Sequence, residues 1–404
     1  MEDLRRGYFR LMADNMISEI IPHAVYNGED HLFDLHLKVK MEDDLALRVG
    51  GNVASNGVNQ IYIGATYHNL NYYAKEMSID GQIGQVYNNL QLAGRMDFPT
   101  HLPTSYRFIA SMSSLDYFKQ ERLFTSGNTP VFNKNKEYFL KLQMSMPFLT
   151  SQKAEFSIGV GRLEDQYFQT NVIDFVNDNR DQSSYNIFGG SVALEGNTLD
   201  SRQFATSGRK ERLVANVYTG KEHYKDGVYN EESPMSKYEY TQSWLQISYE
   251  LERYSQLSSQ FTLGQYIHSY YSSRNFSQNY TATMMQAGTF APTAHSKISY
   301  NEAFRANQFI GAGLIPIFKL NSVVQARAEV YGFMPIFPIM KDEDNKAYYG
   351  KTFSKVEYMG QISLVIKLPF GAVSAYVNHY SSPTKNWNAG LTLGWQLFNS
   401  RFIE

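Results

Sequence analysis

A few residues of this chain are of types that could do chemistry, but their spacing argues against catalysis. His268 stands beside Ser269, which suggests a serine esterase built into a sheet. A catalytic serine needs a base within hydrogen-bond reach, yet neighbouring residues of a strand face opposite sides. The run GGSVA at 189–193 lacks the final glycine of a Gly-x-Ser-x-Gly nucleophile elbow and lies within an expected strand. The sequence therefore predicts no catalytic residue in this chain.

The potential metal ligands are equally dispersed. The acidic run KDEDN at 341–345 lacks the glycine of an EF-hand loop, which favours a solvated loop. His31 and His36 fall on opposite faces of an expected strand, and the chain contains no cysteine. We therefore expect no metal site and no cofactor.

The composition restricts the class of protein. The 404 residues include 30 Tyr and 26 Phe, yet the mean hydropathy is -0.40, so the chain is rich in strand formers but polar on average. No run of about 18 apolar residues exists, which excludes a helical membrane protein. A transmembrane β-barrel is allowed, because alternating side chains hide its apolar surface from a sliding window. The net charge of -2 gives no electrostatic basis for binding nucleic acid.

Apolar and polar residues alternate in many segments after residue 45. The segment SVVQARAEV at 322–330 places Gln325, Arg327 and Glu329 on one face and small apolar residues on the other. Such charges would be costly in a packed core but are ordinary in a water-filled lumen. A soluble β-sandwich or propeller is the alternative, and no blade-length repeat supports it.

The strands and connections indicate the architecture. We count about sixteen antiparallel strands over residues 42–404, with hairpin turns expected at Asn56-Gly57 and Asn88-Asn89. Short connections alternate with long ones, which are 119–133, 165–185, 222–239, 272–306 and 334–350. This asymmetry is typical of outer-membrane barrels, so the predicted fold class is an all-β, about 16-stranded antiparallel transmembrane β-barrel.

Residues 1–41 have a different pattern. Residues 3–20 predict an amphipathic helix that Pro22 ends, and the segment HLFDLHLKVK at 31–40 alternates as a strand. This stretch is too short for its own core, so it predicts a partial α/β module before the barrel. The N-terminus lacks the apolar stretch of a signal peptide, and we therefore expect an upstream region.

One segment carries a resemblance to a known family. LEGNTLDSRQFATSGRKERLVANV at 194–217 resembles the turn-and-strand signature of the BamA/TamA-type bacterial surface antigen superfamily of outer-membrane assembly factors. Asp200 and the run Phe204 to Gly208 stand where the superfamily has an acidic residue and a Phe-Pro-Thr-x-Gly run, with Ala205 in place of proline. The resemblance implies a sixteen-stranded barrel in the bacterial outer membrane. It also implies that residues 1–41 are a partial, periplasmic POTRA segment.

The same resemblance implies a role for the loop 272–306. AFRANQF at 303–309 occupies the place of a Val-Arg-Gly-Phe/Tyr motif on a loop that folds into the lumen, although Ala306-Asn307 departs from the glycine. Arg305 would dock on acidic groups of the inner wall, and Glu329 and Glu357 have the parity of the lumen face. The sequence thus predicts a lock of Arg305, Glu329 and Glu357. A solvated loop arginine is the alternative.

The last strand, in LTLGWQLFNSRFIE, is expected to close the barrel by pairing with the first strand near 45–55. The superfamily's mechanism centres on a weak seam between these strands. Gly50, Gly51, Gly394 and Trp395 are the predicted seam residues, and ordinary lumen packing is the alternative for the glycines.

Four further segments, RGYFRLM, LFDLHLKVK, NEAFRANQFIGAGL and LPFGAVSAYVNHYSSPTKNWNAGLTLGW, resemble the POTRA and barrel portion of outer-membrane patatin-like phospholipases. The resemblance implies a membrane domain in outer-membrane lipid that anchors a periplasmic or upstream patatin domain. It also implies a barrel that moves a polypeptide or lipid substrate into or through the membrane. A porin-like diffusion channel is the alternative function.

Overall fold

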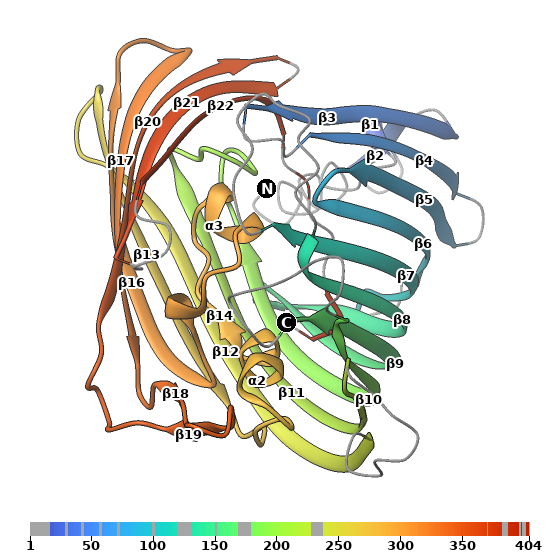
Figure 1. The fold of residues 1–404 in the computed structure, drawn as a ribbon. Coiled ribbons are helices and arrows are strands. Elements are labelled where there is room, and N and C mark those ends of the chain that lie inside the picture. The colour runs from blue at the N-terminus through green and yellow to red at the C-terminus, as the bar shows by residue number, and fades with distance from the viewer. Residues whose placement is uncertain are drawn as a thin grey trace.

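The computed structural model describes residues 17–28, 31–41, 44–55, 59–70, 73–98, 102–118, 131–149, 152–168, 179–227, 237–369, 371–381, 387–395, 397 and 401–403. Sixteen antiparallel strands within these residues close into one barrel, in which successive strands pair (Figure 1). This confirms the predicted all-β, sixteen-stranded antiparallel barrel and the pairing of the last strand with the first. The strands are β3 (Leu45–Ala54), β4 (Gln60–Leu70), β5 (Ala74–Gly84), β6 (Tyr87–Phe98), β7 (Thr104–Phe118), β8 (Val131–Leu149), β9 (Gln152–Tyr167), β10 (Asp181–Asn197), β11 (Gly208–Lys225), β12 (Lys237–Gln256), β13 (Phe261–Ser272), β16 (Gln308–Lys319), β17 (Val324–Pro335), β20 (Glu357–Leu368), β21 (Gly371–Tyr380) and β22 (Trp387–Gly394).

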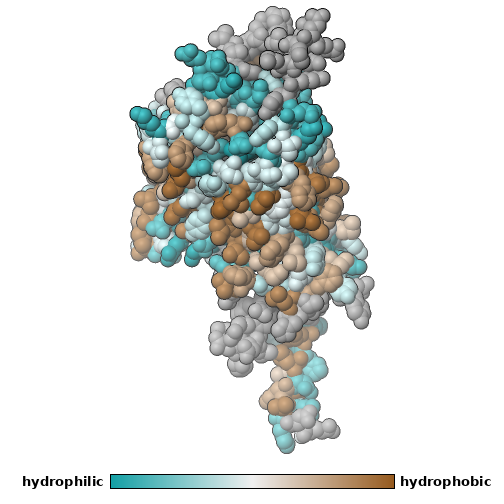
Figure 2. All heavy atoms as spheres, turned by 90° about the horizontal axis from the view of Figure 1, so that it is seen from below, coloured by the Kyte–Doolittle hydropathy of each residue, from teal (hydrophilic) through white to brown (hydrophobic). Residues whose placement is uncertain are grey.

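Side chains alternate across the barrel wall as the sequence predicts. Outward residues are large and apolar, such as Val49, which is 81% exposed, and Ile63. Figure 2 shows hydrophobic side chains gathered over the middle of one face, with hydrophilic side chains toward one end. The polar residues Gln325, Arg327 and Glu329 face inward and are buried. An outer surface this apolar suits contact with lipid, while the inner face is that of a polar lumen.

The wall is unequal in height around the barrel. β8 has 19 residues and β12 has 20, whereas β3 has 10 and β22 has 8. Crossing a bilayer takes about 9–11 residues, so the longest strands extend well past that length. The barrel is therefore tallest around β8 to β12 and lowest where it closes.

The N-terminal hairpin corrects one prediction. β1 (Ile17–Asn27) and β2 (Leu32–Met41) form a separate two-stranded antiparallel sheet. The helix predicted over residues 3–20 is wrong at residues 17–20, which belong to β1, and residues 3–16 lie outside the described residues. Pro22 does not end a helix but lies within β1, opposite Leu37. Pairing with the alternating β2 supplies a hydrogen-bond ladder that outweighs the weak helix preference of this segment.

A second correction concerns the turn between β5 and β6. The chain turns at Gln85–Val86, and the predicted turn residues Asn88 and Asn89 lie inside β6. The Gly84 N–H donates to the Asn88 Oδ1 at 3.1 Å, so this asparagine supports the turn from within the strand. The other predicted turn, Asn56-Gly57, falls outside the described residues, although β3 and β4 pair as expected.

Two long connections contain structure of their own. Between β13 and β16 lie α2 (Tyr280–Gln286), β14 (Gly288–Thr289), α3 (Ala294–Ile298), the 3-10 helix η2 (Glu302–Phe304) and β15 (Arg305–Ala306). Between β17 and β20 lie β18 (Ile339–Lys341) and β19 (Ala347–Tyr349). In the described part of the chain, no helix has the length and apolar character to cross a membrane.

Candidate functional site

The loop 272–306 packs against the inner wall of the barrel. Figure 1 shows α2, β14 and α3 within the ring of strands. On one side the Asn279 side chain donates to the Tyr167 hydroxyl of β9 at 2.9 Å. On another side His295 shares a 2.6 Å hydrogen bond with the Tyr380 hydroxyl of β21. The loop therefore bridges walls that lie far apart in the order of strands.

An aromatic cluster holds the second half of the loop. The Phe290 ring lies 5.6 Å from the Phe333 ring of β17, and Phe304 lies 5.7 Å from the same ring. Phe290 and Phe304 are 1% and 2% exposed. A buried Phe contributes several kcal/mol, of the order of the 3–5 lost on truncation to Ala. The loop is thus fixed by packing as well as by hydrogen bonds.

The first half of the loop rests on the connection between β17 and β20. The Tyr280 N–H donates to the Asn345 carbonyl at 2.8 Å, and the Phe276 ring centre lies 4.4 Å from that of Tyr349. Met284 of α2 packs in a buried cluster with Ile339 of β18. The predicted outer loop 334–350 therefore supports the loop 272–306.

Arg305 does not make the predicted ion pairs. Its Nη1 donates to the backbone carbonyls of Met284 and Met285 at 3.1 Å each, and its guanidinium lies 4.7 Å from the Tyr300 ring centre. The side chain is buried, yet all these partners lie on its own loop. Arg305 thus ties the end of the loop back to α2.

Glu329 and Glu357 face the lumen as predicted, but they bind other cations. The Arg327 Nε donates to the Glu329 Oε1 at 3.3 Å, and Tyr331 donates to the other oxygen at 2.7 Å. Glu357 pairs with Lys355 at 3.0 Å and accepts a hydrogen bond from Ser381. The predicted lock of Arg305 with these two carboxylates is absent from the described structure.

Arg327, rather than Arg305, is the arginine that pairs with Glu329, and it also contacts the turn between β10 and β11. Its Nη1 donates to the Ala205 carbonyl at 2.9 Å, and its guanidinium lies 5.8 Å from the Phe204 ring centre. Phe204 and Ala205 belong to the turn 198–207 between β10 and β11, which carries the family-like motif. Arg327 is 4% exposed, so this buried cation joins β17 to the turn that connects β10 and β11. In the sequence, the sign of this role is that Arg327 and Glu329 share one face of a predicted strand.

The turn 198–207 is itself organised by Asp200. The Thr206 N–H and hydroxyl both donate to this carboxylate at 2.8 Å, and the Ser207 N–H donates at 3.3 Å. Burial raises the pKa of Asp200, but these hydrogen bonds outweigh it and hold the pKa below its usual value. Asp200 therefore acts as the ionised centre of the motif.

The seam between β22 and β3 is short. Among the described residues three pairs form its ladder, Thr392 with Ala54, Leu393 with Val53 and Gly394 with Asn52. Two backbone bonds flank the ladder, from the Ser55 N–H to the Leu391 carbonyl at 2.9 Å and from the Trp395 N–H to the Gly51 carbonyl at 3.0 Å. By contrast, all 18 residues of β11 pair with β12.

Three of the four predicted seam residues lie at the seam. Gly394 has a φ of 110°, and a Cβ there would lie 2.1 Å from the Gly51 carbonyl oxygen. A Cβ on Gly51 would lie 2.3 Å from the Gln60 carbonyl oxygen, and Trp395 donates to Gly51 as described. Gly50 pairs with β4 and makes no ladder pair with β22 in the described structure. Close backbone approach thus explains Gly51 and Gly394.

The described structure gives no support for a catalytic site at His268 or for a metal site. His268 approaches a serine on the neighbouring strand, Ser248, with 3.3 Å between Nε2 and Oγ. Sequence adjacency could not show this pair. The other ring nitrogen, Nδ1, is buried without a hydrogen-bond partner, so no third group orients the imidazole. The described residues contain no cluster of three or more His, Asp or Glu that could hold a metal ion.

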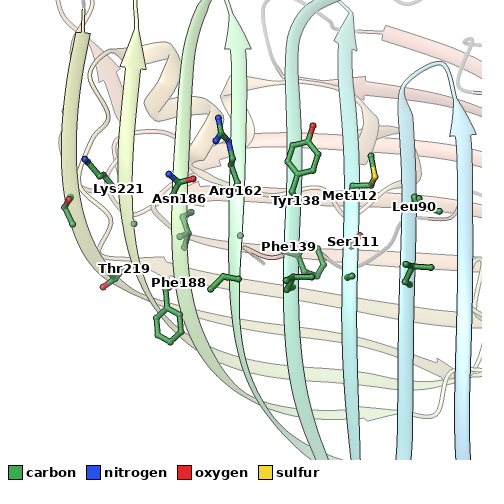
Figure 3. Close-up of a pocket in the computed structure, with 18 residues that line it drawn as sticks. Leu90, Ser111, Met112, Tyr138, Phe139, Arg162, Asn186, Phe188, Thr219 and Lys221 are labelled. Atoms are coloured by element: carbon green, nitrogen blue, oxygen red, sulfur yellow. The ribbon is translucent and has the colours of Figure 1, made fainter.

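The outer wall carries a hollow across β6 to β12. Its lining includes the outward residues Leu90, Met112, Tyr138 and Phe188 (Figure 3). These side chains are all 38–57% exposed and mostly apolar. Hydrocarbon chains would fill such a surface, so the hollow belongs to the lipid-facing side of the wall.

Comparisons with known proteins identify the fold. No protein-family model and no curated protein matches the sequence. The structure is similar to that of BamA from Haemophilus ducreyi lacking POTRA domains 1-3, with a TM-score of 0.64 and 12% identity over 97% of this chain and 77% of that chain. It is also similar to CdiB from Acinetobacter baumannii, with a TM-score of 0.50 and 9% identity over 94% of this chain and 66% of that chain. The fold is therefore that of the BamA and CdiB barrels.

Proposed function

We propose that this chain is an outer-membrane barrel of the bacterial surface antigen superfamily, which inserts or translocates polypeptide through a short seam beside a loop-filled lumen. The observation that carries the proposal is the three-pair ladder between β22 and β3 in a barrel whose other strand pairs are longer. Backbone groups on an open strand edge offer hydrogen bonds to an incoming strand. A seam of three pairs is the least costly place to expose such an edge.

The contents of the lumen support this proposal over a passive channel. The loop 272–306 crosses between β9 and β21 and is anchored by buried aromatics. The turn 198–207 reaches Arg327 from the opposite rim. A diffusion pore needs an open water path, which these two segments obstruct. We infer that the loop 272–306 plugs the barrel.

The test locks the seam. The chain has no cysteine, so Val53→Cys with Leu393→Cys introduces one reactive pair across the seam, on the outward face. The protein is reconstituted in liposomes, and the folding rate of an unfolded outer-membrane barrel is measured before and after bridging with a short thiol reagent. We expect the reduced protein to accelerate folding and the bridged protein to lose that acceleration.

A matched pair controls for the effect of bridging itself. Val49 and Ile63 are opposite one another on β3 and β4, both outward, and a bridge between their cysteine variants leaves the seam free. This control should keep its activity when bridged. Equal folding activity of the seam variant with and without the bridge would refute the seam mechanism. Large, steady conductance without folding activity would identify a porin.

We further propose that the barrel is the membrane domain of a patatin-type protein, anchored in outer-membrane lipid with its N-terminal segment in the periplasm. The support is the resemblance of segments such as NEAFRANQFIGAGL, together with the hairpin of β1 and β2 outside the barrel. Sequencing the encoding gene upstream of residue 1 tests this directly. A Gly-x-Ser-x-Gly hydrolase domain there is expected, and its absence would remove the patatin assignment.

A further inference from the structure

Leu397 and residues 401–403, which follow the seam in the sequence, lie against two separate parts of the inner wall. The Leu397 N–H donates to the inward side chain of Gln60 at 3.4 Å. Residues 401–403 then lie against β8, β9 and β11. Gln60 is on β4, and β4 and β8 are four strands apart in the barrel, so Leu397 and residues 401–403 contact separate parts of the inner wall. This placement is not explained by closure of the barrel.

The wall offers this segment a buried carboxylate. Glu137 of β8 is 2% exposed, and its oxygens accept hydrogen bonds from the Phe402 N–H and from the Arg401 Nε at 3.5 Å. Arg401 also donates to Asn135 at 3.2 Å. Among the described residues these donors to Glu137 all come from 401–403 rather than from the wall. A buried charge without wall partners is costly, so the wall is built to receive an external donor.

A recess for one aromatic ring adjoins this carboxylate. Phe402 is 5% exposed and stacks on Phe139 with 5.7 Å between ring centres. On β9 the three atoms nearest to a Cβ added to Gly161 all belong to the Phe402 ring, the closest at 2.8 Å. The Tyr218 hydroxyl of β11 donates to the Phe402 carbonyl at 3.0 Å and closes the recess. The bare glycine thus leaves the volume that the ring fills.

The site is also connected to the loop 272–306. Asn135, which accepts from Arg401, donates to Asp165 of β9 at 2.5 Å. Asp165 accepts in turn from Gln286 of α2. One polar network therefore joins residues 401–403, the wall and the lumen loop.

We infer that the inner wall around Glu137, Phe139 and Gly161 is a binding site for a polypeptide segment that contains an Arg-Phe pair. In this structure the chain's own Arg401 and Phe402 occupy the site. The Glu137 carboxylate binds the arginine side chain and the phenylalanine N–H of the segment. The recess beside Phe139 and Gly161 binds the phenylalanine ring. The site goes beyond the proposed seam function and is a property of the wall whether or not the barrel moves polypeptide.

The experiment measures binding of a labelled peptide to the full-length chain. The peptide Asn-Ser-Arg-Phe-Ile-Glu reproduces residues 399–404. In the Arg401→Ala, Phe402→Ala double variant the site is vacant, and we expect saturable binding measured by fluorescence anisotropy in detergent. The native chain should bind at least tenfold more weakly, because its own residues fill the site. A peptide with Ala at both positions should not bind the vacant variant.

Substitutions of the wall locate the site. Adding Gly161→Leu to the vacant variant should weaken peptide binding at least tenfold, whereas Gly94→Leu, whose Cβ meets open space, should not. Glu137→Gln keeps the side-chain volume and should also weaken binding, so it decides the question if the leucine variant does not fold. Equal binding by native and vacant chains, or unchanged binding after both wall substitutions, would overturn the inference. Neither result depends on folding activity, so this test is distinct from that of the seam.

Discussion

The seam and the tall wall of β9 to β12 close the same barrel in different ways. Along the tall wall, long ladders pair the backbone N–H and C=O groups, and β11 pairs along its full length with β12. At the seam three residue pairs form the ladder in the part of the chain that the structure describes. Beside the seam, Leu397 donates to the inward side chain of Gln60, and residues 401–403 bind Glu137 on the distant strand β8. The comparison indicates that backbone ladders stabilise the tall wall, whereas contacts of lumen residues contribute more of the stability at the seam.

The largest expected effect comes from the cation that joins the wall to the turn 198–207. Arg327→Ala leaves Glu329 buried without its cation, which should lower the free energy of unfolding by about 3–5 kcal/mol. Urea unfolding followed by the heat-dependent gel shift measures this. As a control, Arg209→Ala removes a half-exposed ion pair with Glu211 and should change the free energy of unfolding by less than about 1 kcal/mol. Similar losses in both variants would show that lumen burial adds nothing to this ion pair.

Arg305→Ala should loosen the lumen loop without removing a wall contact. It deletes a buried guanidinium with two hydrogen bonds to α2, a loss of about 1.5–3 kcal/mol. We expect larger and flickering conductance in planar bilayers, with faster hydrogen exchange across residues 280–306. Lys341→Ala, at an exposed position of the connection between β17 and β20, is the control and should leave conductance unchanged. A steady conductance identical to that of the native chain would exclude a plug held by Arg305.

Gly394→Val tests the seam directly. The new Cβ would collide with the Gly51 carbonyl, and the φ of 110° is strained for valine, at a cost of about 1–3 kcal/mol. Hydrogen exchange of residues 52–55 should become faster, while exchange along β11 stays slow. Gly332→Val adds a Cβ in open space on β17 and serves as the control. Unchanged protection at residues 52–55 would mean that the seam does not depend on close approach of these strands.

The smallest effect concerns pH. The folded pKa of Asp200 lies below its unfolded value of about 3.9, so its stabilising contribution is present above that value. It is lost as the pH falls through the folded pKa. Exchange or proteolysis of the turn 198–207 should therefore increase below about pH 4 in the native chain. Asp200→Asn should remove this pH dependence, and a persistent dependence in that variant would assign it to another group.

Several features of the site could be predicted from the sequence because they depend on parity alone. Glu329 and Glu357 were placed on the lumen face by counting along their strands. Gly51, Gly394 and Trp395 were placed at the seam because they lie where the first and last strands meet. The partner of Arg305 could not be predicted, since it depends on how the loop 272–306 folds back on α2. The alternation of residues 322–330 places Arg327 on the lumen face, but nothing in the sequence distinguishes it as the partner of Glu329 and of the turn 198–207.

The sequence by itself determined the number of strands, the two faces of the wall and the closure of the last strand on the first. These follow from a period of two, which is a local property of the chain. Only the tertiary structure decided which charges meet, how few pairs form the seam and that Phe402 lies against Gly161. The seam pairs, the contact of Phe402 with Gly161 and that of Arg327 with the turn 198–207 join residues far apart in the sequence. They depend on the distances across a closed lumen, which no local pattern encodes.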